Sequence, residues 1–114
     1  MTLLQAVVTF TPGGVVTEAN DLFLDTMGYD LHEVVGKHHR LFMDSKAAAT
    51  PEYAQFWAEL GNGSSFCQGD FERVNKSGKI VWLNATYTPI VIEGRVVKIV
   101  KYAQDITEQK LGKK

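Results

Sequence analysis

Runs of apolar and β-branched residues, separated by polar turn residues, lie near both ends of the chain, and this pattern predicts β-strands. Residues 4–10 are rich in apolar and β-branched side chains, Thr11-Pro12-Gly13-Gly14 supplies turn residues, and residues 15–17 form a second short apolar run. The N-terminal part therefore predicts a hairpin. Three longer strand-like runs lie toward the C-terminus and are separated by Lys76-Ser77-Gly78 and Glu93-Gly94: residues 66–74, 79–92 and 96–107.

Between these strands the pattern favours short helices. Asn20 can cap a helix over residues 21–27, which Gly28 is suited to end in a left-handed conformation. Asp30 and Glu33 then have the spacing of a capping box at the start of a segment over residues 31–35, closed by Gly36.

The clearest helix is expected over residues 51–60. Thr50 can cap it, and Pro51 suits its first position. Apolar side chains recur along it at i, i+3, i+4 and i+7, which predicts one buried face: Tyr53, Phe56, Trp57 and Leu60.

Two strands, several short helices and three long strands predict an α+β fold, with a five-stranded antiparallel sheet and the helices packed on one face. A length of 114 residues suits one domain, which we place at residues 1–107. Residues 108–114 are polar and are expected to begin a C-terminal linker or signalling helix.

Composition and charge exclude several classes of protein. Hydrophobic residues make up 45% and charged residues 22%, as in ordinary globular proteins. A net charge of −1 provides no field that would attract nucleic acid. The apolar stretches are far shorter than the roughly 20 residues needed to cross a bilayer, and no signal peptide is evident. We therefore expect a cytoplasmic domain without direct membrane insertion.

The sequence contains no arrangement typical of an enzyme. No phosphate-binding glycine loop, metalloprotease helix or nucleophile-base constellation is evident, and His32–Glu33 and His38–His39 are adjacent pairs that cannot chelate from one helix face. Cys67 is the single cysteine, which excludes an internal disulfide. It is expected to be a reduced core residue, with a redox-sensing thiol as the alternative.

These features, in this order and at this spacing, resemble the PAS family along nearly the whole chain. The run from His38 to Phe42, the aromatic helix and the run from Trp82 to Ile90 look most like the PAS modules of bacterial methyl-accepting chemotaxis proteins. The resemblance implies a signalling module with a pocket between sheet and helices, which is also where small domains usually bind ligands.

The resemblance raises three cofactor hypotheses. Light-sensing relatives carry a cysteine that adds to flavin, where this chain has His39. Those relatives also hold the flavin ring through two asparagines and a glutamine, where this chain has Arg73, Leu83 and Ala103. Cysteinyl-flavin photochemistry is therefore not expected.

Haem b is the second hypothesis. Oxygen-sensing relatives mostly place a ligating histidine on the long helix, and residues 51–60 contain none. His38 and His39 remain as candidate iron ligands, because a neutral imidazole can bind haem iron. Partly exposed or hydrogen-bonded structural histidines are the alternative.

Non-covalent FAD is the third hypothesis and rests on similarity to the aerotaxis transducer. Trp57, Gly63 and Phe66 match the spacing of a tryptophan, a glycine and an aromatic residue in that group, and His39 matches a histidine. A flat aromatic ring could stack on a flavin. Core packing alone is the alternative for Trp57, and the domain could also contain no cofactor.

Alternation along residues 80–87 assigns Val81, Leu83, Ala85 and Tyr87 to one sheet face, which the resemblance turns toward the pocket together with Arg73. Arg73 could pair with an anionic ligand group and Tyr87 could donate a hydrogen bond to a ligand. A salt bridge and a backbone hydrogen bond are the respective alternatives. The opposite face would present an apolar patch for a homodimer or a neighbouring signalling domain: Ile80, Trp82, Val100 and Tyr102.

Asp105 and Thr107 stand where the last strand leaves the domain, and in the family such residues couple that strand to the output helix. A plain strand end is the alternative. The function that these features predict is a sensory module that binds a small ligand or cofactor and relays its state through the last strand. A ligand-free PAS domain used for dimerisation or docking is the second hypothesis.

Overall fold

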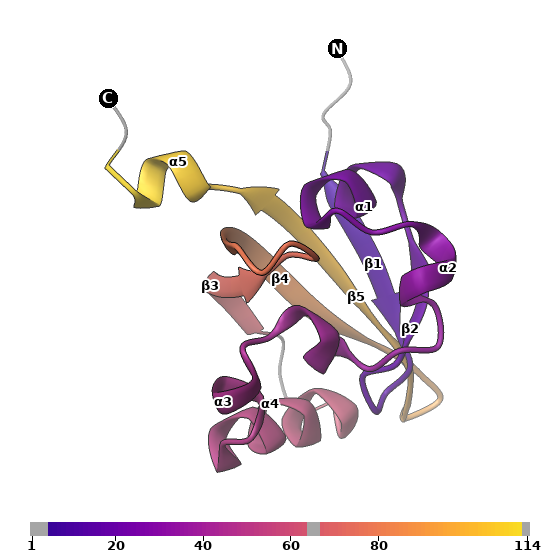
Figure 1. The fold of residues 1–114 in the computed structure, drawn as a ribbon. Helices are drawn as coiled ribbons and strands as arrows, with labels where there is room; N and C mark the ends of the chain where they lie inside the picture. Colours follow the sequence, from indigo (N-terminus) through magenta and orange to yellow (C-terminus); the bar gives the residue numbers. More distant parts are fainter. Residues whose placement is uncertain (1–4, 64–66, 113–114) are drawn as a thin grey trace.

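The structure is a computed structural model that describes residues 5–63 and 67–112, and it contains the predicted five-stranded antiparallel sheet. The strands lie in the order β2-β1-β5-β4-β3, so the first and last strands of the chain are neighbours (Figure 1). Their bounds are Ala6–Phe10 (β1), Val16–Ala19 (β2), Cys67–Val74 (β3), Ile80–Ile92 (β4) and Arg95–Asp105 (β5).

The helical segments between β2 and β3 cover one face of this sheet (Figure 1). Asn20 begins the first of them as predicted, because its Oδ1 accepts the backbone N–H groups of both Phe23 and Val7 and so ties the helix to β1. The segments are α1 (Asp21–Met27), α2 (Leu31–Val34), the 3₁₀ helix η1 (His39–Phe42), α3 (Ser45–Ala48) and α4 (Pro51–Gly61).

The capping predictions for the other helices also hold. Thr50 Oγ1 accepts the N–H of Tyr53 at the start of α4, and the Asp30 N–H donates to Glu33 Oε1 at 2.8 Å. Gly28 ends α1 with φ of 79°, a left-handed conformation that favours glycine. Among the described residues, no helix has the length and apolar character needed to cross a membrane.

The prediction for the last strand was wrong at its C-terminal end. We expected residues 96–107, but β5 stops at Asp105 and a short helix, α5 (Thr107–Lys110), follows. The carboxylate of Asp105 accepts the N–H of Thr107 at 2.9 Å, which turns the chain out of the sheet. The apolar Ile106 continues the strand pattern, so hydrophobicity alone gave no signal for this turn.

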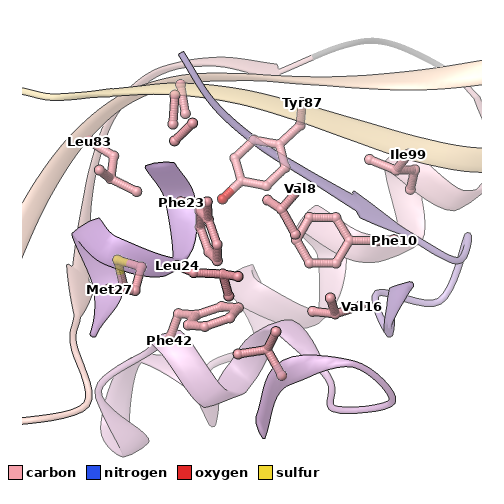
Figure 2. Close-up of a cluster of buried hydrophobic side chains, with 14 of the residues drawn as sticks. Val8, Phe10, Val16, Phe23, Leu24, Met27, Phe42, Leu83, Tyr87 and Ile99 are labelled. Atoms are coloured by element: carbon pink, nitrogen blue, oxygen red, sulfur yellow. The ribbon is translucent and has the colours of Figure 1, made fainter. Parts of the chain in front are cut away.

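The inner sheet face and the helices share one core (Figure 2). Side chains from the strands, including Tyr87 and Leu83, point toward Phe23 and Phe42 from the helical side. The predicted alternation along β4 is confirmed, because Val81, Leu83, Ala85 and Tyr87 are all buried. The face assigned to a ligand is therefore the face that the helices cover.

Candidate functional site

His39 lies at the centre of the interior and is fully buried. Its backbone is fixed because the chain from Gly36 to His39 runs beside residues 14–16, which lead into β2: the His39 N–H donates to Gly14 O, and Val15 and His38 form an isolated β-bridge. Gly14 has φ of 98°, and a Cβ there would lie 2.8 Å from His38 Nε2. The glycine of the first hairpin thus allows the close approach that brings His39 inside.

A chain of hydrogen bonds joins His39 to both the sheet and α4. His39 Nε2 is 2.9 Å from Tyr87 Oη, and His39 Nδ1 is 2.7 Å from Tyr53 Oη. Arg73 Nη2 donates to Tyr87 Oη at 3.0 Å, and Arg73 Nη1 donates to Glu72 O at 2.8 Å. We call Arg73, Tyr87, His39 and Tyr53 the interior network, and it links β3, β4, η1 and α4.

One arrangement of hydrogens accounts for the contacts that run from Arg73 Nη2 through Tyr87 and His39 to Tyr53. Because Tyr87 Oη accepts from Arg73, its own hydrogen is free to donate to His39 Nε2, and His39 Nδ1–H then donates to Tyr53 Oη. This arrangement requires a neutral imidazole. Burial, aided by the positive charges of Lys101, Arg73 and His38, holds the pKa of His39 well below 6.5.

Lys101 adds a second basic side chain to this interior. It is completely buried on β5 opposite Tyr87, and its Nζ lies 4.9 Å from the centroid of the Tyr87 ring and 5.8 Å from that of Phe23. Within the described residues, neither Lys101 Nζ nor Arg73 Nε has a hydrogen-bond partner. Burial, followed by the charge of Arg73, lowers the pKa of Lys101 well below its usual 10.5.

Aromatic rings fill the space around the interior network. Trp57 lies 5.2 Å from His39 and 6.2 Å from Tyr87, measured between ring centroids, and Phe56 lies 5.0 Å from Tyr87. Rings at these separations are in contact. The elements predicted to enclose a pocket do enclose this region, but in this conformation their side chains occupy it, so a ligand larger than a few atoms would displace some of them.

A row of small residues crosses the inner sheet face next to Tyr87 and Lys101. The register places Ala6 opposite Ala103, Ala103 opposite Ala85 and Ala85 opposite Gly69. A Cβ built on Gly69 would meet only Phe71 Cζ within 4 Å, at 3.8 Å. We call Ala6, Ala103, Ala85 and Gly69 the small-residue row. None of them has a side chain longer than a methyl group, so they do not cover the sheet backbone as larger residues would.

The residues present do not fit a haem without rearrangement. His39 uses both ring nitrogens in the interior network. His38 also uses both, because its Nδ1 accepts the N–H of Arg40 and its Nε2 lies 3.0 Å from Gly13 O. Either histidine would have to break one of these bonds to bind iron.

The fit to a flavin is mixed. Trp57, His39 and Tyr87 contact one another in the interior, but Leu83 and Ala103, at positions where the resemblance implies groups that hold a flavin ring, supply no side-chain hydrogen-bonding group. Phe66 lies outside the described residues. Burial raises the pKa of the half-buried Cys67, which keeps the thiol protonated.

The four residues predicted to form an interface all lie on the outer sheet face but do not form one patch. Val100 and Tyr102 pair with Thr88 and Thr86 of β4, whereas Trp82 lies two rows further along, beyond the polar pair Asn84 and Gln104. Ile80 is half exposed and lines a surface hollow of about 510 Å³ between α3 and the β3–β4 hairpin. The expected single apolar surface is therefore divided.

Asp105 and Thr107 lie where the chain leaves the sheet, and hydrogen bonds join them to each other and to β4. Thr107 Oγ1 accepts the N–H of Trp82 at 3.0 Å and donates to Asp105 Oδ1 at 2.5 Å. Lys110 of α5 lies over the Trp82 ring, 5.0 Å from its centroid, and forms an ion pair with Asp70 at 3.1 Å. Thus α5 is held against β4 through Trp82, as well as through its covalent link to β5.

An antiparallel sheet in this order, with short helices on one face, is a PAS-like α+β fold. The chain belongs to the PAS domain family, whose profile matches residues 4–108. It is 42% identical over 103 residues to the biofilm dispersion protein BdlA of Pseudomonas aeruginosa, and 29% identical over 99 residues to the aerotaxis receptor of Escherichia coli K12.

These alignments cover 90% and 85% of this chain but only 24% and 19% of the two relatives, so the chain spans about a quarter or less of each. Among solved structures, an RNA-binding light-oxygen-voltage receptor matches with a TM-score of 0.79 at 22% identity, over 93% of this chain and 31% of its own. A PAS domain from Colwellia psychrerythraea matches with a TM-score of 0.77 at 20% identity, over 93% of this chain and 89% of its own. These two structures support the fold alone.

Sequence reasoning missed two members of the buried polar cluster. Tyr53 was assigned to the apolar face of α4, and its hydroxyl contact with His39 could not be read from helical periodicity. Lys101 was not singled out, although a signal existed: it occupies an inner position in the alternation Ile99, Lys101, Ala103. A lysine at such a position is unusual, because lysine is rarely buried without a partner.

Proposed function

We propose that this PAS domain is a sensory module of a chemotaxis-type transducer, which binds a small ligand between the inner sheet face and η1 and α4. It acts as a sensor and not as a catalyst. One observation carries the proposal: polar and basic side chains gather in the core, and among the described residues Arg73 Nε and Lys101 Nζ have no hydrogen-bond partner. A core that served only stability would have no use for such groups.

The connectivity of the interior network supports a relay. A ligand that competes for the hydroxyl of Tyr87 changes the bonds of Arg73 and His39 together, and so changes how β3 and β4 are joined to η1. The next strand, β5, continues from Lys101 beside Tyr87 to Asp105, where the exit contacts begin. Ligand binding would therefore shift the population of α5 arrangements.

The relatives support the signalling context. The aerotaxis receptor and the biofilm dispersion protein each contain a region similar to most of this chain within a longer protein. We propose a corresponding role as one domain of a longer transducer, with residues 1–107 as the sensor and residues 108–114 as the start of the output segment.

The second candidate function is a ligand-free dimerisation or docking domain. The close contact of Phe56, Trp57 and Tyr87 in the interior favours it, since a packed core requires no ligand. The outer sheet face favours it as well, because Tyr102 is 45% exposed and Val100 lies beside it on the same face. In either case we propose that this face meets a second copy or a neighbouring signalling domain.

Native mass spectrometry of the purified chain, together with its absorption spectrum, separates the two functions. A bound small molecule gives excess mass that disappears on unfolding, and a flavin or a haem b, the cofactors that the resemblance suggests, would colour the protein. In the Ala85→Leu variant, which fills part of the small-residue row, the excess mass should be lost. Retention of the excess mass in a folded Ala85→Leu variant would place the ligand elsewhere.

A further inference from the structure

Two basic side chains enter the core without a matching acid. Among residues 5–63 and 67–112, the buried polar or charged residues are Thr9, His39, Arg73 and Lys101, and none of them is an aspartate or a glutamate. Burial of an unpaired cation is strongly unfavourable, so buried charges in proteins are normally paired or bound to a ligand of opposite charge. The interior therefore has an excess of positive charge or of proton-accepting amine.

Both bases converge on a single side chain. Arg73 donates to the hydroxyl of Tyr87, and Lys101 Nζ lies 4.9 Å from the centroid of the Tyr87 ring. This convergence places two donors without partners, Arg73 Nε and Lys101 Nζ, around one ring of the interior.

The small-residue row helps to provide the room in which Arg73 reaches Tyr87. Arg73 is paired with Val81, six positions before Tyr87 on β4, a separation of about 20 Å along an extended strand. Their side chains nevertheless come within 3.0 Å, so they must lean toward each other across the two intervening inner rows, Phe71–Leu83 and Gly69–Ala85. Longer side chains in the small-residue row would obstruct this approach.

We propose that this interior site takes a small organic carboxylate, whose charge is held by Arg73 and Lys101 and whose hydrocarbon part lies against the small-residue row. The inference rests on the proposed sensory function and specifies the chemistry of the ligand. The planar guanidinium suits the two oxygens of a carboxylate. Leu83 and Phe71, which flank the row, offer apolar contacts that a bare inorganic anion would not use.

Calorimetric titration of the chain with matched probes tests the charge requirement. The probes are propionate and benzoate, their neutral amides propionamide and benzamide, and inorganic phosphate, all at constant pH and ionic strength. Each carboxylate should bind at least tenfold more tightly than its amide and more tightly than phosphate. Lys101→Met should lower carboxylate affinity at least tenfold, whereas Lys98→Met, on the exposed side of the same strand, should leave it unchanged.

Two variants locate the binding. Ala85→Leu and Gly69→Val, which each add three carbon atoms to the row, should both remove carboxylate binding while retaining the β-rich circular dichroism of the parent chain. Any one of four results would overturn the inference. These are equal affinity for a carboxylate and its amide, unchanged carboxylate affinity in Lys101→Met, tighter binding of phosphate than of the carboxylates, and no carboxylate binding to the parent. A ligand detected by native mass spectrometry alongside any of these results would leave the sensory function standing, so the two proposals fail separately.

Discussion

Lys101→Met should make the ligand-free domain more stable. The amine of Lys101 is buried without a hydrogen-bond partner in the described structure, and leaving such a group unsatisfied costs about 1–3 kcal/mol. Methionine has a similar length and can keep the contacts with the rings of Tyr87 and Phe23. We expect the free energy of unfolding at neutral pH to rise by about 1–3 kcal/mol, or roughly 4 °C in Tm per kcal/mol.

The stabilisation should depend on pH with a defined sign. Burial lowers the pKa of Lys101 in the folded state, whereas in the unfolded chain the side chain titrates near its ordinary value of about 10.4. Between these two pKa values the unfolded chain binds the extra proton, so the stability of the parent rises with pH. The advantage of Lys101→Met should therefore shrink from neutral pH toward pH 10, by up to about 1.4 kcal/mol per pH unit.

Urea unfolding of the parent, Lys101→Met and Lys98→Met at several values from neutral to alkaline pH measures both effects. Lys98 is exposed on the same strand, so its substitution should change stability little and add no such pH dependence. A Lys101→Met variant less stable than the parent at neutral pH, or a stability difference that stays constant with pH, would refute the burial argument.

Three other substitutions test further parts of the structure. Tyr87→Phe leaves Arg73 Nη2 and His39 Nε2 without the hydroxyl they share, so it should lower the free energy of unfolding in urea by about 2–3 kcal/mol. Tyr53→Phe should lower it less, because the hydroxyl of Tyr53 is only partly buried. Gly14→Ala should lower Tm more than Gly78→Ala, since both glycines have positive φ but only at Gly14 would a Cβ lie within 3.2 Å of His38 and Trp57; equal losses would contradict the close approach. Thr107→Val removes the hydroxyl that accepts the Trp82 N–H and should speed hydrogen exchange of that amide, whereas Thr107→Ser keeps a hydroxyl and should retain its protection. Equal exchange rates in the two variants would contradict a role for this hydrogen bond.

Much of the fold was readable from the sequence because local signals and the hydrophobic pattern agree. Asn20 and Thr50 cap the starts of their helices and Gly28 ends its helix as expected, and the period-two pattern of β4 assigned its faces correctly. The pattern failed where a short polar interaction overrides it. Asp105 and Thr107 turn the chain after the last strand, and the apolar Ile106 between them concealed this turn, so the strand was expected to continue to residue 107.

The candidate site was only partly readable. Strand alternation together with the family resemblance placed Arg73 and Tyr87 on the covered face, but their bond to each other depends on how side chains lean across intervening rows. The burial of His39 depends on the pairing of β2 with the segment that precedes η1, a contact between regions separated by more than twenty positions. Such tertiary contacts leave no periodic trace in a single sequence.

Hydrogen exchange at the Trp82 amide, which donates to Thr107 Oγ1 at the exit, tests most directly whether the interior is coupled to the output segment. The comparison is between the parent, Tyr87→Phe and Tyr102→Phe, with rates corrected for changes in global stability measured in urea. Because Tyr102 is exposed on the outer face, its substitution is the matched control. The account predicts several-fold faster exchange of Trp82 in Tyr87→Phe alone, and an unchanged rate in that variant would contradict it.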